Sequence, residues 1–293
     1  MPAKAAILAA LTAFTLAYAA VLAASVRSGW RTGAAWVPSA AHLITGFVTN
    51  FFDTLGIGSF ATSTAIFKFR RMVPDKLIPG TLNAGHTLPT IFQAFIYIAA
   101  IEVDVATLVL LIGSATIGAW FGAGWVAQLS RRAVQLAMGG TLLVAAAALL
   151  MRQFSLFPIG GEALQLSGGP LVIGMVGNLM LGAISTLGIG FYAPCMTLVS
   201  LLGMNPAAAF PIMMGSSAFL MPVASSRFVR NQAYYVSVAL GLAAGGLAGV
   251  PVAAFVVKSL ELTALRWLVL VVIIYAAALM LRSARQPGAE QSE

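Results

Sequence analysis

The chain has little of what a soluble protein or a metalloenzyme needs. Only 8% of its 293 residues are charged, whereas a soluble domain carries about 25%. The single cysteine, Cys195, excludes an intrachain disulfide and a cysteine-rich metal site. The two histidines, His42 and His86, are far apart in sequence, which argues against a histidine-based metal site. We therefore expect neither a metal nor a cofactor.

Acidic residues are also scarce, with 8 Asp and Glu against 16 Lys and Arg and a net charge of +8. A basic balance can indicate nucleic-acid binding. Here the basic residues lie in short clusters between apolar runs, where the positive-inside rule places them in membrane proteins. The sequence contains no nucleotide-binding loop. We therefore expect no nucleic-acid partner and no direct use of ATP.

Apolar sequence makes up most of the chain. Hydrophobic residues account for 60% and the mean hydropathy is +0.96, and several runs reach the roughly 20 residues that span a bilayer. The alternating segments of a membrane barrel are absent. These features predict an all-α, polytopic integral protein of the cytoplasmic membrane. Residues 5–26 are expected to be an uncleaved first span, although Ala-Tyr-Ala-Ala at 17–20 resembles a signal-peptidase site.

One five-residue motif occurs twice. Thr54-Leu55-Gly56-Ile57-Gly58 recurs, letter for letter, 132 residues later at 186–190. The same offset pairs two prolines in each copy, Pro74 with Pro206 and Pro79 with Pro211. Glycines and prolines are residues that a plain apolar span would avoid. The pattern predicts a duplicated membrane domain in which each copy carries one broken helix.

The basic clusters predict the topology. Arg27 and Arg31 precede residues 39–67, and a second basic cluster follows them, so this segment is expected to enter the membrane, break at 53–58 and return as a re-entrant hairpin. The second hairpin is expected at 171–202. Seven full spans are expected at 5–26, 78–101, 105–127, 133–151, 210–226, 233–257 and 263–282.

Three spans between the hairpins make the repeats inverted, with the N-terminus outside and the C-terminus inside. If residues 39–67 instead cross fully, the repeats become parallel. The expected divisions are a first span and basic loop at 1–37, repeat 1 at 38–152, a linker at 153–170, repeat 2 at 171–282 and a polar tail at 283–293.

The breaks predict a binding pocket. A helix that stops inside the membrane leaves unpaired N–H groups that suit an anion, and glycine lets a ligand approach the backbone. The expected substrate-binding residues at the breaks are Thr54, Gly56, Gly58, Ser59, Thr186, Gly188, Gly190 and Tyr192. Asn83, His86, Ser216 and Ser217 are expected to complete the pocket walls, or else to form hydrogen bonds between helices.

Asp53 is the only acidic residue inside an apolar stretch, away from its ends. An intramembrane carboxylate is costly and is by default a functional hypothesis. Asp53 is expected to be a coupling site for a proton or cation, a cap of the second half-helix, or a group that reaches a shallow wet vestibule. Ser185 stands at the equivalent position of the second copy. We take proton coupling by Asp53 as the hypothesis to test.

A glycine-containing break in each half of a duplicated membrane domain, followed by a basic or proline-bearing loop and a glycine-faced span, resembles the sulfite exporter TauE/SafE family. The resemblance covers about residues 40–282. The family's break often continues with three glycines and a proline, whereas here Ser59-Phe60 and Phe191-Tyr192 follow, and only Pro194 keeps the proline. The resemblance implies a secondary transporter, often an exporter, of sulfite, sulfonates or related sulfur or carboxylate anions.

Two other functions compete with transport. A membrane-embedded enzyme needs a convergent cluster of acids and histidines or a Ser/His pair, and the sequence offers too few such residues to predict one. A structural subunit of a larger complex would gain stability by losing two polar glycine breaks. We therefore expect no enzyme and no catalytic residue. The expected partners are a small anionic substrate, the lipid bilayer and a second copy of the chain in a homodimer.

Overall fold

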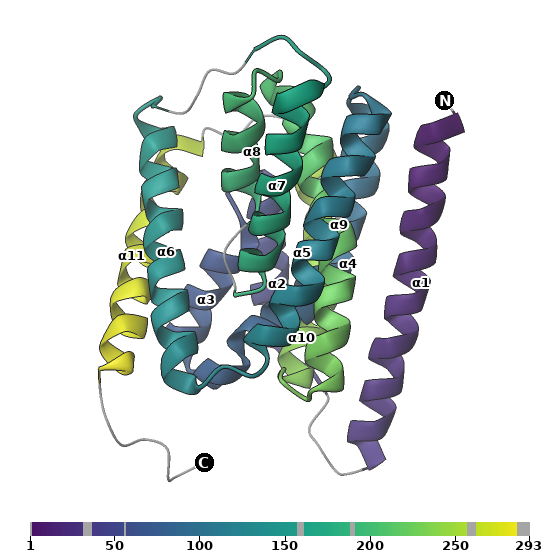
Figure 1. Ribbon diagram of the computed structural model, residues 1–293. Coiled ribbons are helices and arrows are strands. Elements are labelled where there is room, and N and C mark those ends of the chain that lie inside the picture. The colour runs from purple at the N-terminus through teal and green to yellow at the C-terminus, as the bar shows by residue number, and fades with distance from the viewer. Residues whose placement is uncertain are drawn as a thin grey trace.

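The computed structural model describes residues 2–31, 37–55, 57–156, 161–187, 191–256 and 262–285. These residues form eleven α-helices and no β-strand; one isolated bridge joins Ala163 to Met204. The helices are α1 (Pro2–Arg31), α2 (Ala40–Thr54), α3 (Ser59–Arg70), α4 (Ile78–Ala100), α5 (Val105–Val126), α6 (Arg131–Gln153), α7 (Gly168–Ser185), α8 (Tyr192–Leu201), α9 (Pro206–Arg230), α10 (Val236–Pro251) and α11 (Leu262–Ala284) (Figure 1). A short 3₁₀ turn (Asp75–Leu77) precedes α4, and a π-helical turn (Val252–Val256) follows α10.

Among the described residues, five helices are long and apolar enough to cross a membrane. They include the segments Lys4–Arg27, Val105–Val126, Gly168–Ser185, Ala207–Arg230 and Val236–Phe255. Four of them match predicted full spans, whereas the fifth, α7, was expected to be one arm of a hairpin. The other three predicted spans are the 23-residue helices α4, α6 and α11, which are not among the five. α4 is less apolar than the five because it carries polar residues such as Asn83 and Gln93, which are buried.

Two helices are interrupted where the repeated motif lies. The first break separates α2, which ends at Thr54, from α3, which begins at Ser59. Gly58 in this break has a φ of 96°, a conformation that glycine adopts without strain. The second break separates α7 from α8. Both interruptions occur where the sequence predicts them, and α3 occupies the lower half and α8 the upper half of the view in Figure 1.

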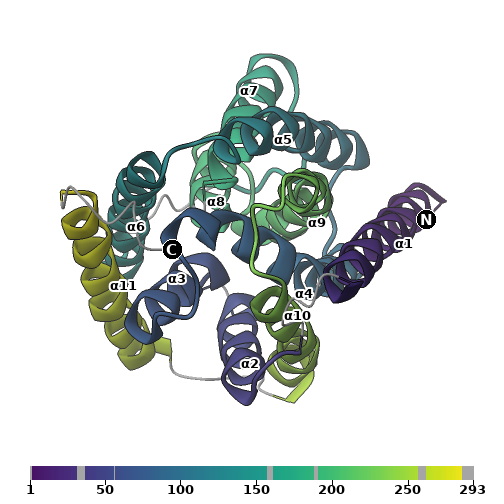
Figure 2. The same ribbon diagram turned by 90° about the horizontal axis from the view of Figure 1, so that it is seen from below.

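The first helix of each broken pair packs along an unbroken helix from the other half of the chain. α2 lies along α10 and α7 lies along α5, and Figure 2 shows these two pairs on opposite sides of α4 and α9. Glycines permit the close approach. A Cβ atom at Gly245 or Gly249 of α10 would overlap the backbone of α2, and one at Gly118 or Gly122 of α5 would overlap the backbone of α7.

The helix ends that carry the basic clusters lie together. The C-terminal ends of α1, α3, α9 and α11 and the N-terminal end of α6 are all at the lower end of the molecule in Figure 1. The connection between α4 and α5, with Glu102 and Asp104, is at the upper end. At the basic end Lys68 forms an ion pair with Asp75 at 2.7 Å.

Helix α1 lies at the edge of the bundle (Figure 2). Hydrogen bonds join it to the rest of the described chain, among them one from Lys4 Nζ to the Ile101 carbonyl at 3.0 Å. The hydroxyl of Tyr18 donates to the Ala84 carbonyl of α4 at 2.8 Å, and the hydroxyls of Ser25 and Tyr234 are 2.6 Å apart. Outward-facing apolar side chains such as Phe121 and Trp125 on α5, and Val176 on α7, are more than half exposed, as expected of surfaces that face lipid.

Candidate functional site

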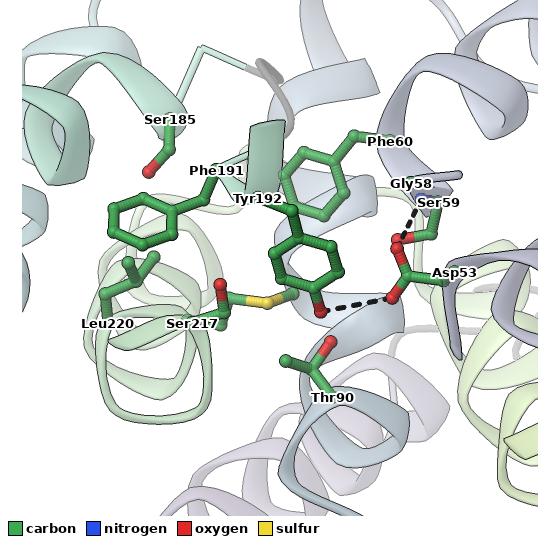
Figure 3. A pocket seen from close by; sticks show the side chains of 11 residues that line it. Asp53, Gly58, Ser59, Phe60, Thr90, Ser185, Phe191, Tyr192, Ser217 and Leu220 are labelled. Atoms are coloured by element: carbon green, nitrogen blue, oxygen red, sulfur yellow. Dashed lines mark hydrogen bonds between the residues drawn. The ribbon is translucent and has the colours of Figure 1, made fainter. Parts of the chain in front are cut away.

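A small cavity lies where the two helix breaks meet. Its volume is about 30 Å³, on a scale where a single water needs about 10–15 Å³. It therefore has room for about two waters or for a ligand of a few atoms. Its lining comes from both breaks and from α4 and α9 (Figure 3), and consists of Asp53, Gly58, Ser59, Phe60, Thr90, Ser185, Phe191, Tyr192, Ser217, Leu220 and Met221.

Asp53 caps the helix that follows its own break. The side chain is 1% exposed, and its Oδ1 accepts a hydrogen bond from the backbone N–H of Ser59 at 2.6 Å. Ser59 is the first residue of α3, so the carboxylate satisfies an amide that would otherwise lack an acceptor. This is the geometry of the capping alternative. Proton coupling by Asp53 stays a prediction.

The same carboxylate connects the two breaks. Asp53 Oδ2 accepts from the side-chain amide Nε2 of Gln93 at 3.0 Å and from the hydroxyl of Tyr192 at 3.2 Å. The Tyr192 hydroxyl also lies 2.9 Å from Gln93 Oε1 and is shared between the two acceptors. Tyr192 is the first residue of α8. Two predicted site residues that are 139 positions apart therefore meet at one carboxylate (Figure 3).

The cavity contains one carboxylate and no basic side chain. Its other polar side chains are hydroxyls, and the aromatic rings of Phe60, Phe191 and Tyr192 form much of its wall. In a site of low dielectric, an ionised Asp53 would repel an anion placed beside it. An anionic ligand therefore requires that the charge of Asp53 be neutralised first.

The second break is not capped in the way of the first. The hydroxyl of Ser185 donates to the Gly182 carbonyl of its own helix at 2.8 Å, and the hydroxyl of Thr186 donates to Ala183 at 2.7 Å. No side-chain hydrogen bond caps the start of α8 within the residues that the structure describes. The first amides of α8 are therefore a site where an anion would be favourable.

Several predicted residues lie outside the cavity lining. The hydroxyl of Thr54 donates to the Asn50 carbonyl of its own helix at 2.8 Å. The amide of Asn83 donates to the Pro79 carbonyl at 2.8 Å, and its Oδ1 is buried without a partner. Ser216 is fully buried and its hydroxyl has no partner either. Gly56, Gly188 and Gly190 lie outside the described residues.

His86 forms hydrogen bonds between helices and does not line the cavity. Its Nδ1 is 3.0 Å from Asn50 Oδ1 and its Nε2 is 2.9 Å from Ser63 Oγ, and all three side chains are fully buried. The amide nitrogen of Asn50 donates to the Gly46 carbonyl, so Asn50 Oδ1 accepts and Nδ1 of His86 carries a hydrogen. These hydrogen bonds join α2, α3 and α4. They agree with the second of the two roles predicted for His86, hydrogen bonding between helices.

A row of polar residues on α4 was not predicted from the sequence. Thr90 lines the cavity, Gln93 holds Asp53 and Tyr192, and the hydroxyl of Tyr97 donates to the Thr54 carbonyl at 2.8 Å. These positions are three and four residues apart, so they share one helix face. Polar residues at this spacing in an apolar span could have predicted that this face of the helix lines the site.

Comparison with known proteins found no match for the chain. No protein-family model, no curated protein and no solved structure matches it.

Proposed function

We propose that the protein is a secondary transporter that moves a small anion across the cytoplasmic membrane. One observation carries the proposal: two helix breaks from distant parts of the chain meet at one small cavity that contains a buried carboxylate. Interrupted helices are tolerated at membrane depth where they are buried in protein or line a cavity. In transporters such breaks form the substrate site near the middle of the membrane.

The packing of the helices supports inverted repeats. A shift of 132 residues relates α2 to α7, α3 to α8, α4 to α9, α5 to α10 and α6 to α11. The two helix pairs with the most extensive contact are α2 with α10 and α5 with α7. The same shift relates one pair to the other, because it maps α2 onto α7 and α5 onto α10. The second arms α3 and α8 lie toward opposite ends of the molecule (Figure 1), as two re-entrant hairpins from opposite sides would. Alternating access to a central site is the usual use of this architecture.

The basic end of the molecule is assigned to the cytoplasm. Positive residues are retained on that side of the membrane, so the N-terminus is outside and the C-terminus inside. Single cysteines at Lys76 and Glu162 test this, because the one native cysteine, Cys195, is fully buried. A membrane-impermeant maleimide should label the two positions from opposite sides. Labelling from the same side would reject the topology.

The substrate is a small anion bound at the start of α8. The uncapped amides there provide the positive end of a helix dipole, and the cavity admits only a few non-hydrogen atoms. Sulfite is an anion of a few atoms, and it agrees with the resemblance to the TauE/SafE family. Glycine and hydroxyl groups hold such an ion without a fixed positive side chain, which lets it leave again.

Flux measurements in proteoliposomes test the proposal. Sulfite, sulfoacetate, taurine and thiosulfate are offered in turn to the purified full-length chain. Ser185→Leu, which fills the cavity from α7, should abolish the flux of the transported anion. Val176→Leu on the exposed face of the same helix is the control and should transport normally. Absence of flux for every anion with the wild-type protein would reject the proposal.

A membrane-embedded hydrolase is the second candidate, and one observation favours it. Ser63, His86 and Asn50 form the hydrogen-bonded order of nucleophile, base and orienting group. Full burial of Ser63 opposes this function, because a substrate has no approach to its hydroxyl. A fluorophosphonate probe should therefore leave the wild-type protein unlabelled. Labelling that disappears in Ser63→Ala would favour the hydrolase.

A further inference from the structure

Ser217 is a buried polar group that lacks a partner. Its side chain is 2% exposed, it lines the cavity from α9, and its hydroxyl makes no hydrogen bond within the described residues. Buried hydroxyls are nearly always paired, because an unpaired one loses its hydration without compensation. Ser217 lies on the cavity wall (Figure 3), so its hydroxyl is available to a ligand inside the cavity.

Asp53 on the opposite wall carries a charge that no basic group of the cavity balances. Its three hydrogen-bond donors, the Ser59 N–H, the Gln93 amide and the Tyr192 hydroxyl, are all neutral. Hydrogen bonds stabilise a buried carboxylate, but they do not cancel its charge. Buried charges in proteins are paired with an opposite charge or coordinate a cation.

We propose that the cavity is a binding site for one small monovalent cation of the size of Na⁺. Its ligands are the carboxylate of Asp53 and the hydroxyls of Ser217, Thr90 and Tyr192. The Thr90 and Tyr192 hydroxyls lie beside the carboxylate in Figure 3. Oxygen ligands of this kind suit a hard cation. The cavity volume of about 30 Å³ holds Na⁺ with one retained water.

The charge of the site selects a monovalent ion. Sites for divalent cations combine several carboxylates, or nitrogen and sulfur ligands. The described part of the chain has no group of three or more His, Cys, Asp or Glu residues that could hold a metal ion. One carboxylate and one monovalent cation leave the cavity neutral.

A proton explains the cavity less completely than a cation does. A protonated Asp53 would have to donate its hydrogen to the Tyr192 hydroxyl, which would then donate only to Gln93 Oε1. However, a proton would leave the Ser217 hydroxyl without a partner. A cation between the two walls satisfies both Asp53 and Ser217.

The ion gives Asp53 a role in substrate binding. Once the carboxylate is neutralised, it no longer repels an anion at the start of α8. The assignment of Na⁺ as the coupling ion rests on the proposed transport function. The binding of Na⁺ itself does not, and it is measured without any anionic substrate.

Binding of ²²Na⁺ to the purified full-length protein in detergent tests the site. Wild type should bind about one ion per chain, displaced by unlabelled NaCl but not by choline chloride. Asp53→Asn should lose saturable binding. Ser217→Ala should weaken it roughly three- to tenfold, as expected for one neutral ligand. Ser225→Ala, another buried serine on α9, is the matched control and should bind as wild type does.

Each failure has a distinct meaning. Absence of saturable ²²Na⁺ binding, or full binding by Asp53→Asn, overturns the cation site. Equal affinities of Ser217→Ala and Ser225→Ala remove Ser217 from it, and recovery in Ser217→Thr guards against a folding defect. Anion flux driven by a pH gradient without ²²Na⁺ binding would reject the cation site and keep the transporter. ²²Na⁺ binding without any anion flux would keep the cation site and reject the transporter.

Discussion

The two helix breaks share five identical letters but differ in how their polar groups are satisfied. In the first break Asp53 caps α3, and Gly58 has the positive φ that allows the chain to turn there. In the second break Ser185, at the equivalent position, donates to its own helix and leaves the start of α8 uncapped. One break therefore supplies a negative charge, and the other supplies a helix start that no side chain is seen to cap.

The difference shows that the glycine motif provides the interruption and that its neighbours determine the chemistry. A hydroxyl and a carboxylate at the same position behave differently, because serine can donate to a carbonyl of the preceding turn whereas an ionised aspartate only accepts. Two copies of one motif can thus take different roles in one cavity.

The largest contrast is expected between the two equivalent positions. Asp53→Ser removes the cap of α3 and the only charge in the cavity, so anion flux should fall to background. Ser185→Ala removes one hydroxyl that is bonded within its own helix, and flux should change by roughly twofold at most. Initial rates in proteoliposomes measure both. Similar losses in the two variants would remove the distinction between the breaks.

Asp53→Asn separates the cap from the charge. Asparagine caps helices about as well as aspartate does, so the free energy of unfolding should stay within about 1 kcal/mol of wild type. Accumulation driven by an ion gradient should be lost while anion exchange persists. Flux under imposed Na⁺ and pH gradients is the measurement. Undiminished gradient-driven accumulation would leave Asp53 as a cap alone.

Tyr192→Phe removes the hydrogen bonds that join the two breaks. Loss of this hydroxyl should destabilise the protein by about 1–2 kcal/mol and reduce flux several-fold, because Asp53 and Gln93 lose their shared donor. Tyr97→Phe is the matched control, since its hydroxyl donates only to the Thr54 carbonyl. Thermal unfolding and flux are compared for the pair. A larger flux defect in Tyr97→Phe would contradict the bridging role of Tyr192.

The smallest effect on flux is expected at Gly58. An alanine Cβ meets no atom within 4 Å there, so the cost of Gly58→Ala comes from the positive φ alone and should be about 1–3 kcal/mol of stability. Gly140→Ala in α6, also without a neighbour within 4 Å, should instead be neutral or slightly stabilising. Chemical denaturation distinguishes the two. Equal stabilities would show that the turn at Gly58 is not strained by a side chain.

The sequence predicted the helices well because apolar run length and flanking charge determine them. The span expected at 78–101 is the helix Ile78–Ala100, and both interruptions occur at the repeated glycines. The partners of Asp53 were not predictable in the same way. Which face of α4 turns toward α2 and α8 depends on packing, so the spacing of Thr90, Gln93 and Tyr97 shows a shared face but not its direction.

The hydrogen-bond partner of Ser185 could not be predicted from the sequence either. A serine near a helix end can cap the next helix or bond back to its own, and the choice depends on the distance to the competing acceptors. His86 shows the same limit. Its position among small polar residues was compatible with the cavity wall, but Asn50 and Ser63 on two neighbouring helices take both of its nitrogens.

The glycine contacts between α2 and α10 and between α5 and α7 determine which parts can move as units. Each contact joins helices from different halves of the chain at a backbone separation that tolerates no side chain. Neither half can therefore rock as an independent body, because its broken helix is locked to the other half. In the proposed transporter, the units that move in a change of access are therefore mixed groups of helices from both halves, and not the two halves of the chain.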